Sequence, residues 1–298
     1  MRILVLGKSG MLGHVVYNHF KENGYTVFGT TQTDEEIEWD AYLNLEKIED
    51  IIQEVKPDAV VNCIGILNQV CEANKPLAVK LNSLLPHYID SLSEKYNFKF
   101  VHVSTDCVFE GTTGKYDETV PSDATSFYGR SKALGEIRND RSVTLRTSIV
   151  GPDANPKGIG LFQWFMKQEN EVGGYSKVIW TGVTTIELAK QIEVAIKNNL
   201  TGLNHVVNND FISKKDLLIL FKEAFNKDIV INENDTVVSE KTLVRTDASY
   251  NFNVPTYKEM VQEMRTWVDN HKDLYPNITV EDKWYESNDN CWNKTRNN

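Results

Sequence analysis

Three glycines follow the first apolar run of the chain at intervals of three residues, in the segment ILVLGKSGMLGHVV. The run predicts a strand, and the helical spacing of the apolar residues after it predicts a helix directly beyond the turn. A tight turn alone needs one glycine, so three at this spacing favour dinucleotide binding. Gly7 would permit the turn, Gly10 would let backbone N–H groups approach a pyrophosphate, and Gly13 would let the helix pack closely on the strand. The predicted cofactor contacts in this turn are Gly7, Gly10, Met11, Leu12 and Gly13.

Short runs rich in β-branched residues alternate with longer segments of helical periodicity in the first half of the chain. The runs are RILVLG, YTVFGT, AVVNCIG, FKFVHVS and SVTLRTS. Apolar strands that alternate with helices are typical of a parallel sheet covered on both faces. The expected fold class is α/β, with a Rossmann-type doubly wound parallel sheet and a smaller C-terminal α/β substrate domain.

The residue composition changes after Ile149, where VGPDANPKGIG is rich in glycine, proline and asparagine. A substrate-contacting insertion is predicted to begin in this segment. Further along, Ser213 with Asp216 three residues later is predicted to cap an amphipathic helix. The expected division is an NAD(P)-binding domain over 1–152 plus about 177–210, a substrate-binding domain over 153–176 and 211–275, and a polar tail over 276–298.

The charge balance and the cysteine pattern exclude several classes of function. The chain of 298 residues carries 32 basic and 42 acidic residues, a formal net charge of −10, so no nucleic-acid or membrane partner is expected. There is no run of about 18 apolar residues and no secretory signal, which predicts a cytosolic protein. The four cysteines form no CxxC pair and share no ligand spacing with the histidines, so no metal site is expected. They are Cys63, Cys71, Cys107 and Cys291.

The end of the second predicted strand, VFGTTQTDEE, bears on the choice of cofactor. An acidic residue at this point would bind the adenosine ribose and exclude a 2′-phosphate. Thr30 and Thr31 are neutral, which tolerates the phosphate, although no arginine is present to pair with it. NADPH is therefore favoured, with NADH as the alternative. The remaining cofactor contacts are expected to be Asn44 and Leu45 on the adenine side and Cys63, Ile64 and Gly65 on the nicotinamide side. Asn44 fits an ordinary turn equally well.

A threonine, a tyrosine and a lysine are predicted to form a proton relay. Thr105 ends the run FVHVST, and Tyr128 and Lys132 are four residues apart in the helical segment FYGRSKALGEI, which places them on one face. The lysine ammonium is expected to lower the pKa of the phenol from its usual value of about 10. Thr105 would bind the substrate oxygen, Tyr128 would exchange its proton, and Lys132 would also hold the nicotinamide ribose. An isolated Y-x-x-x-K match is common by chance, but here it occurs together with the glycine turn.

The motifs GKSGMLG, STDCVF, YGRSKALGE, LRTSIVG and VRTDAS together resemble the extended short-chain dehydrogenase/reductases, most closely the dTDP-4-dehydrorhamnose reductase group. The resemblance covers about residues 1–270 and is looser toward the end, where Thr246 replaces a usual proline. It implies hydride transfer from NAD(P)H to C4 of a nucleotide-linked 4-keto-6-deoxy-hexose. It also implies that Asp106 borders the sugar. Wall or anchor residues of the substrate pocket would be Trp164, Trp180 and Arg245, although ordinary core packing explains the two tryptophans equally well.

Cys107 departs from that group, which usually has tyrosine at this position. A cysteine two residues after the catalytic hydroxyl is similar to the GDP-fucose synthases, where it moves a proton during epimerisation. Those proteins pair it with a histidine, and here no histidine lies between His102 and His205. Two interpretations stay open: an inert buried thiol, or an acid/base for epimerisation at a single carbon.

A function of another class is a non-catalytic dinucleotide-binding subunit, similar to the regulatory subunit of methionine adenosyltransferase. The intact set of Thr105, Tyr128 and Lys132 favours catalysis. The sequence leaves open whether the nucleotide is dTDP, UDP or GDP, whether the sugar carries a 2-hydroxyl or a 2-acetamido group, and whether the chain forms a homodimer.

Overall fold

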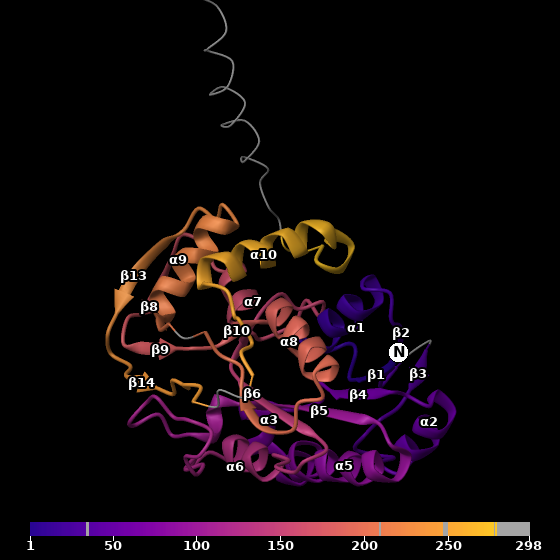
Figure 1. Cartoon of the computed structure of the whole chain (residues 1–298). Coiled ribbons are helices and arrows are strands. Elements are labelled where there is room, and N and C mark those ends of the chain that lie inside the picture. Colours follow the sequence, from indigo (N-terminus) through magenta and orange to yellow (C-terminus); the bar gives the residue numbers. More distant parts are fainter. Residues whose placement is uncertain (34–35, 209, 247–249, 277, 279–298) are drawn as a thin grey trace, which may run out of the picture.

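The computed structural model describes residues 1–33, 36–208, 210–246, 250–276 and 278. Its centre is a seven-stranded sheet in the order β11-β6-β5-β4-β1-β2-β3, in which every neighbouring pair is parallel (Figure 1). The strands are β1 (Arg2–Leu6), β2 (Thr26–Thr31), β3 (Ile37–Glu38), β4 (Ala59–Asn62), β5 (Lys99–Thr105), β6 (Val143–Thr147) and β11 (Gly202–His205). The five strands expected from apolar runs are confirmed, as is the doubly wound α/β fold.

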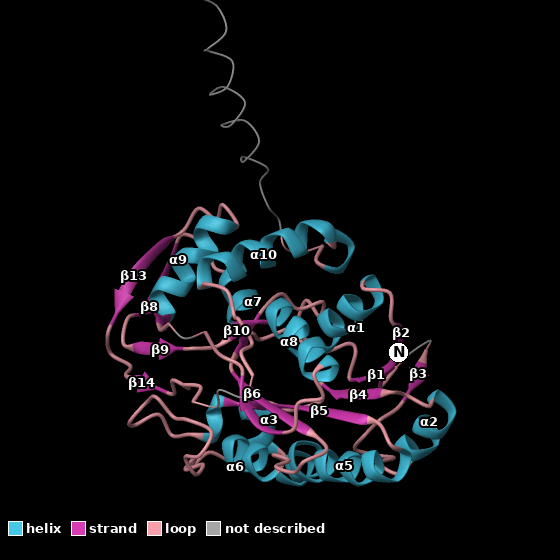
Figure 2. Ribbon diagram, viewed as in Figure 1, coloured by secondary structure: helices cyan, strands magenta, loops and turns pink. Residues whose placement is uncertain are grey.

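Helices cover both faces of this sheet (Figure 2). Successive side chains of β1 show why: Ile3 and Val5 belong to one apolar core, and Leu4 and Leu6 to the other. The first core includes α1 (Gly13–Glu22), α8 (Thr185–Lys197) and α10 (Tyr257–Asn270), and the second includes α2 (Lys47–Val55) and α5 (Leu85–Tyr96). Because a parallel strand points alternate side chains to opposite faces, both sets are buried.

The segment KPLAVKLNSLLPHYIDSLSEKY, whose apolar residues recur at helical spacing, does not form one continuous α-helix. It forms α4 (Lys75–Ala78), a π-helix (Val79–Leu84) and then α5. In the π-helix the Asn82 side chain accepts from Ile66 N at 3.0 Å and donates to the Ser131 hydroxyl at 3.1 Å. The neighbouring Ser83 hydroxyl donates to Ser131 O at 2.7 Å. The wide turn therefore fixes α6 (Phe127–Leu134), the helix that carries the predicted relay.

A smaller part of the chain lies on the side of the sheet where α8 and α10 pack (Figure 1). Its elements are α7 (Leu161–Met166), β8 (Glu171–Tyr175), β9 (Val178–Trp180), β12 (Ile212–Ser213), α9 (Lys214–Ala224), β13 (Val230–Asn234) and β14 (Ser239–Glu240). The strands form a β12-β9-β14 sheet and a β13-β8 pair, while β7 (Ile149–Val150) pairs with β10 (Val183–Thr184). The predicted cap of α9 is confirmed, because the Ser213 side chain accepts from Asp216 N at 3.0 Å.

The remaining short helices are α3 (Asn68–Ala73) and the 3-10 turns Asp106–Val108 and Lys272–Leu274. The expected polar tail lies outside the described residues, apart from Pro276 and Ile278. None of the helices found in the described part of the chain has the length and apolar character that crossing a bilayer requires. Within those same residues, Cys63, Cys71 and Cys107 are free thiols and no cluster of metal-ligating side chains occurs.

Candidate active site

The glycine turn follows β1 and has a separate structural role for each glycine. Gly7 adopts φ +79°, a conformation that side chains rarely tolerate. A Cβ atom on Gly13 would lie 2.0 Å from Gly7 O, so only glycine lets α1 approach the turn. By contrast, a Cβ on Gly10 would meet only Gly7 O, at 3.4 Å, and would otherwise face open space. Glycine is therefore required at position 7 by the backbone conformation and at position 13 by the close packing of α1, whereas Gly10 faces a cavity.

That cavity, about 420 Å³ in volume, lies at the carboxyl ends of β1, β4, β5 and β6. The sheet order reverses between β1 and β4, and a crevice at such a switch point is the usual ligand site of an open α/β sheet. Many of the predicted site residues meet here: Gly10, Met11 and Leu12, then Cys63, Ile64 and Gly65, then Thr105, Asp106 and Cys107, and finally Tyr128 and Lys132.

The predicted cofactor contacts Thr30, Thr31, Asn44 and Leu45 do not line the cavity. The Thr30 hydroxyl accepts from Gly7 N at 3.1 Å and so braces the glycine turn, while Thr31 is buried beside it. Asn44 is exposed and accepts from the Trp39 indole N–H at 2.8 Å through its backbone carbonyl, while Leu45 is part of the core. The structure thus places these four residues on the β2 side of the sheet, apart from the relay.

The predicted substrate residues other than Thr105 and Asp106 lie outside the lining of the cavity. Trp164 is 39 % exposed on α7, whereas Trp180 is 3 % exposed. The Arg245 guanidinium lies 4.4 Å from the centroid of the Phe252 ring. Trp180 therefore packs in the interior, one of the two roles that its sequence context allowed.

Several lining residues were missed by the sequence reasoning. Thr147 is the last residue of β6 and Ser148 follows it, and this position at the carboxyl end of a parallel strand was a signal that could have identified them. Asn68 on α3 also lines the cavity, and nothing in its local sequence indicates this. Asp153 and Gly160 line it as well; they lie in the loop where a substrate-contacting insertion was expected to begin, although neither residue was singled out.

The relay is assembled by close packing of α6 on the end of β5. The Thr105 hydroxyl donates to Asp106 Oδ1 at 3.1 Å and accepts from Cys107 N at 3.1 Å, which fixes the turn after the strand. A Cβ on Gly129 would lie 2.2 Å from Cys107 O, so the glycine after Tyr128 lets the helix touch this turn. One turn later on α6, Lys132 Nζ donates to Val103 O at 2.7 Å.

Burial determines which relay side chains are protonated. The expectation that Lys132 lowers the pKa of Tyr128 is wrong. The pKa of Tyr128 is raised by burial, with the Thr105 hydroxyl acting in the opposite direction, rather than lowered by the lysine. Burial lowers the pKa of Lys132 to about 8, against the nearby Glu136, which raises it. The phenol therefore keeps its proton at neutral pH, as a proton donor must.

The two residues after Thr105 are also shifted by burial. Burial and the neighbouring Asp106 raise the pKa of the Cys107 thiol to about 12. Burial raises the pKa of Asp106 as well, while Lys214 acts to lower it. Because the thiolate is the form that removes protons, Cys107 is a poor base in this environment.

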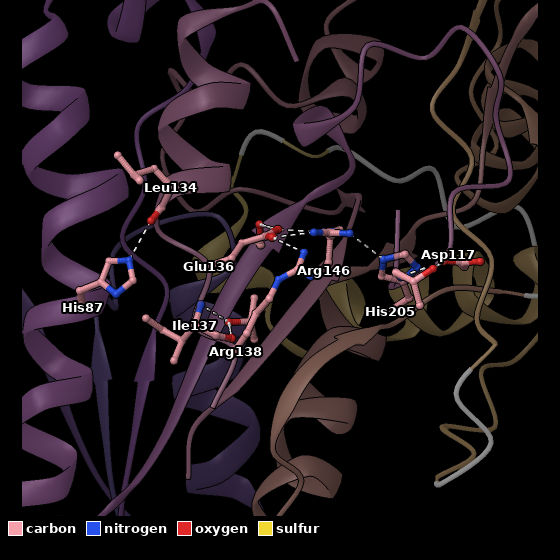
Figure 3. A network of polar contacts seen from close by, with 11 residues as sticks. His87, Asp117, Leu134, Glu136, Ile137, Arg138, Arg146 and His205 are labelled. Carbon is pink, nitrogen blue, oxygen red and sulfur yellow. Dashed lines mark hydrogen bonds and ion pairs between the residues drawn. The ribbon is translucent and has the colours of Figure 1, made fainter. Parts of the chain in front are cut away.

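A buried ionic network joins Glu136, which follows α6, to Arg146 of β6 and His205 of β11 (Figure 3). Glu136 accepts from the Ser104 hydroxyl at 2.8 Å and from Arg146 at 2.8 and 2.5 Å. The third nitrogen of Arg146, Nη1, lies 3.1 Å from His205 Nε2, and His205 Nδ1 lies 2.8 Å from Val244 O. Since arginine only donates and a carbonyl only accepts, His205 is neutral and carries its proton on Nδ1. Burial accordingly lowers its pKa to about 4.

The chain is similar to known proteins over most of its length. The family model "RmlD substrate binding domain" matches residues 1–228. The chain belongs to this family. The dTDP-4-dehydrorhamnose reductase of Aggregatibacter actinomycetemcomitans is 30 % identical over 78 % of this chain and 82 % of that protein. The dTDP-4-dehydrorhamnose reductase of Bacillus anthracis, solved in complex with NADP, is 20 % identical with a TM-score of 0.76, covering 89 % of this chain and 99 % of that one. At that identity the second likeness shows the fold alone.

Two further relatives of this RmlD-family chain match over a shorter span. The probable low-salt glycan biosynthesis reductase Agl14 of Haloferax volcanii is 33 % identical over 50 % of this chain and 54 % of its own length. The methionine adenosyltransferase 2 subunit beta of Xenopus tropicalis is 28 % identical over 51 % of this chain and 48 % of its own length. The chain therefore spans about half the length of these two relatives.

Proposed function

We propose that the protein is an NAD(P)H-dependent reductase that acts on the C4 ketone of a nucleotide-linked 4-keto-6-deoxy-hexose. One observation carries the proposal: Thr105, Tyr128 and Lys132 line the same cavity as the open side of the glycine turn. The similarity to a dTDP-4-dehydrorhamnose reductase over most of both chains supports the substrate class.

The residues at the glycine turn fit a nicotinamide dinucleotide. Gly10 leaves room for a pyrophosphate beside the turn that precedes α1. At the other end, a Cβ on Gly65 would lie 3.9 Å from Lys132 Nζ, so the wall after β4 and the lysine could hold one ribose together. We favour NADPH over NADH, because Thr30 and Thr31 are neutral and the B. anthracis relative was solved with NADP.

In the proposed mechanism the bound cofactor supplies a hydride to C4 of the sugar. The Thr105 hydroxyl hydrogen-bonds the C4 oxygen, and the Tyr128 phenol gives that oxygen its proton as the C–H bond forms. Lys132 orients the cofactor ribose and holds a positive charge near the phenolate that remains. The raised pKa of Tyr128 suits the reducing direction, since the acid must be protonated before the reaction.

We propose a dTDP or UDP sugar as the substrate, including 2-acetamido sugars, and a deoxysugar precursor of cell-surface glycans as the product. The printed name of the Agl14 relative, a glycan biosynthesis reductase, supports this placement. Epimerisation through Cys107 is the weaker alternative, because its thiol has a pKa raised to about 12.

The experiment is turnover with a panel of dTDP-, UDP- and GDP-linked 4-keto-6-deoxy sugars, each supplied with NADPH and then with NADH. We expect NADPH oxidation and a 4-hydroxy product with at least one dTDP or UDP sugar. Binding of NADPH without turnover of any sugar would overturn the proposal and favour the regulatory-subunit alternative, to which the X. tropicalis relative points.

A further inference from the structure

The segment after α10 reaches back to the glycine turn. Tyr275 directly follows the 3-10 turn Lys272–Leu274, and its hydroxyl lies 2.6 Å from His14 Nε2 on α1, 261 residues away in the sequence. The other ring nitrogen, His14 Nδ1, lies 2.9 Å from Gly10 O. His14 is 6 % exposed and Tyr275 is 3 % exposed, so water does not compete for these contacts. A buried chain of hydrogen bonds therefore links the end of α10 to the glycine that faces the cavity.

The two ends of this chain fix the position of every proton in it. The Trp267 indole N–H can only donate, and it donates to the Tyr275 oxygen at 2.8 Å. Gly10 O can only accept, so His14 carries its proton on Nδ1. Burial lowers the pKa of His14, so the ring is neutral and its Nε2 accepts from the Tyr275 hydroxyl. The three bonds thus run in one direction, from Trp267 to Gly10, and each polar group has its partner.

These bonds fix the peptide that joins Gly10 to Met11. Gly10 O accepts from the His14 ring and also from His14 N, at 3.1 Å, while Gly10 N donates to Gly7 O at 3.1 Å. The C=O and N–H of a trans peptide point in opposite directions, so a carbonyl turned toward α1 directs the Met11 N–H away from the helix. Met11 lines the cavity, and its N–H donates to no group of the residues that the structure describes. This N–H is therefore available to an anion at the start of α1.

We propose that His14 is a positioning residue for the cofactor: it holds the Gly10–Met11 peptide so that the N–H faces the pyrophosphate, and Tyr275 holds the His14 ring. This inference rests on the proposed function and adds to it two residues that do not line the cavity themselves. The role requires a donor that reaches Gly10 O, and bulk at position 14 does not replace it.

The chain indicates which substitutions keep this donor and which remove it. Asn18 Nδ2 donates to His14 O at 2.9 Å, four residues back along the same helix. His14→Asn can therefore still donate to Gly10 O, whereas His14→Leu keeps an apolar side chain there and donates to nothing. The matched control is His19→Leu on the same helix, because His19 Nε2 contacts Glu193 at 2.6 Å and not the glycine turn.

Calorimetry with NADPH measures the expected effect on binding. His14→Leu should weaken NADPH affinity about tenfold, because a misdirected N–H loses a charge-assisted hydrogen bond to the phosphate. His14→Asn should bind within about threefold of the wild type, Tyr275→Phe should bind about threefold more weakly, and His19→Leu should be unchanged. In steady-state kinetics the KM for NADPH should rise in parallel, while kcat at saturating NADPH should change less than about twofold.

The protein without cofactor gives a second readout. NMR of the imidazole nitrogens should show a neutral His14 ring with its proton on Nδ1. A proton on Nε2 would overturn the inference, as would unchanged NADPH affinity in folded His14→Leu or an equal loss in His19→Leu. Full affinity in Tyr275→Phe would overturn the part assigned to Tyr275. A melting temperature shared by His14→Leu and His14→Asn shows that the loss is local.

The two proposals fail separately. A wild-type protein that binds NADPH, together with a His14→Leu variant that binds it equally well, refutes only the role of His14. A wild-type protein that binds no nicotinamide dinucleotide refutes the proposed function.

Discussion

The two sides of the cavity are built by different means. On the cofactor side, strands of four to seven residues with buried side chains determine where β1, β4 and β5 end, and the backbone of the glycine turn does the rest. On the other side, β9, β12 and β14 have two or three residues each, and the loop before α7 reaches the cavity with Asp153 and Gly160. The first side is defined by the ends of long strands and the second by a loop.

Lys132 and Lys214 differ in whether the ammonium group has a hydrogen-bond partner. Burial lowers the pKa of both Lys132 and Lys214 to about 8. Lys132 donates to Val103 O at 2.7 Å, whereas Lys214 has no hydrogen bond within the described part of the chain. A lysine that is anchored to the backbone keeps its position before any ligand arrives. Lys132 is thus held in place in the cavity.

The largest expected effect lies on the cofactor side. Gly10→Val should abolish NADPH binding, because the side chain would project into the space that the pyrophosphate needs. The fold should survive, since a Cβ at Gly10 meets nothing closer than 3.4 Å. Calorimetry and thermal melting check both points. Gly173→Val is the control, because a Cβ there has ordinary 3.6 Å contacts on β8. NADPH affinity retained in folded Gly10→Val would remove the dinucleotide from this turn.

A second change tests the boundary between the two sides. Tyr128→Phe keeps the ring but removes the proton donor, so kcat for ketone reduction should fall at least ~10²-fold with little change in NADPH affinity. Steady-state kinetics and calorimetry measure the two quantities. Tyr25→Phe, which removes a phenol bonded to Glu193 at 2.8 Å, should leave kcat unchanged. Near-normal turnover in Tyr128→Phe would mean that the proton comes from another group.

The pH dependence of kcat tests whether Lys132 must be charged. Below about pH 8 Lys132 is charged; as the pH rises through that value its ammonium is lost, and Glu136, Cys71 and Cys63 are the groups that oppose the loss. At saturating substrate, kcat should therefore fall on the alkaline side by about tenfold per pH unit. Lys132→Arg stays protonated and should lose this alkaline limb, whatever its absolute rate. A limb that persists unchanged in Lys132→Arg would assign the titration to a different residue.

The smallest effect is expected at Cys107. A thiol whose pKa is raised to about 12 does not ionise at neutral pH, so Cys107→Ser should change kcat less than about twofold. NMR of a 4-keto sugar in D₂O should show no deuterium at C3 or C5 with the wild-type protein. Deuterium that appears with the wild type and vanishes with Cys107→Ser would restore the epimerase interpretation.

The same contrast explains what the sequence could predict. The strands, the roles of Gly7 and Gly13 and the Ser213 cap depend on neighbours within a few residues, so local pattern predicted them correctly. The pKa of Tyr128 was predicted in the wrong direction, because burial by distant segments outweighs the lysine one helical turn away. The π-helix at Val79–Leu84 was missed for a related reason: Asn82 is drawn to Ile66 and Ser131 by tertiary contacts.

The substrate side was the least predictable region. Asp153 and Gly160 reach the cavity on a loop that only the tertiary fold brings there. The sequence left Trp180 open between a wall of the pocket and core packing, and the structure buries its ring beside the Lys214 ammonium. Motifs identified where chemistry occurs, and tertiary contacts decided which side chains surround it.

The last strand of the main sheet has a consequence for how the chain is made. Six of the seven strands are encoded within residues 2–147, but β11 begins at Gly202, after the loop and strands of the smaller part. Synthesis proceeds from the N-terminus, so the outer edge of β6 has no partner strand until β11 has left the ribosome. Arg146, buried at that edge, must likewise wait for His205. The ribosome thus delivers the closing strand of the main sheet only after the loop whose Asp153 and Gly160 line the cavity.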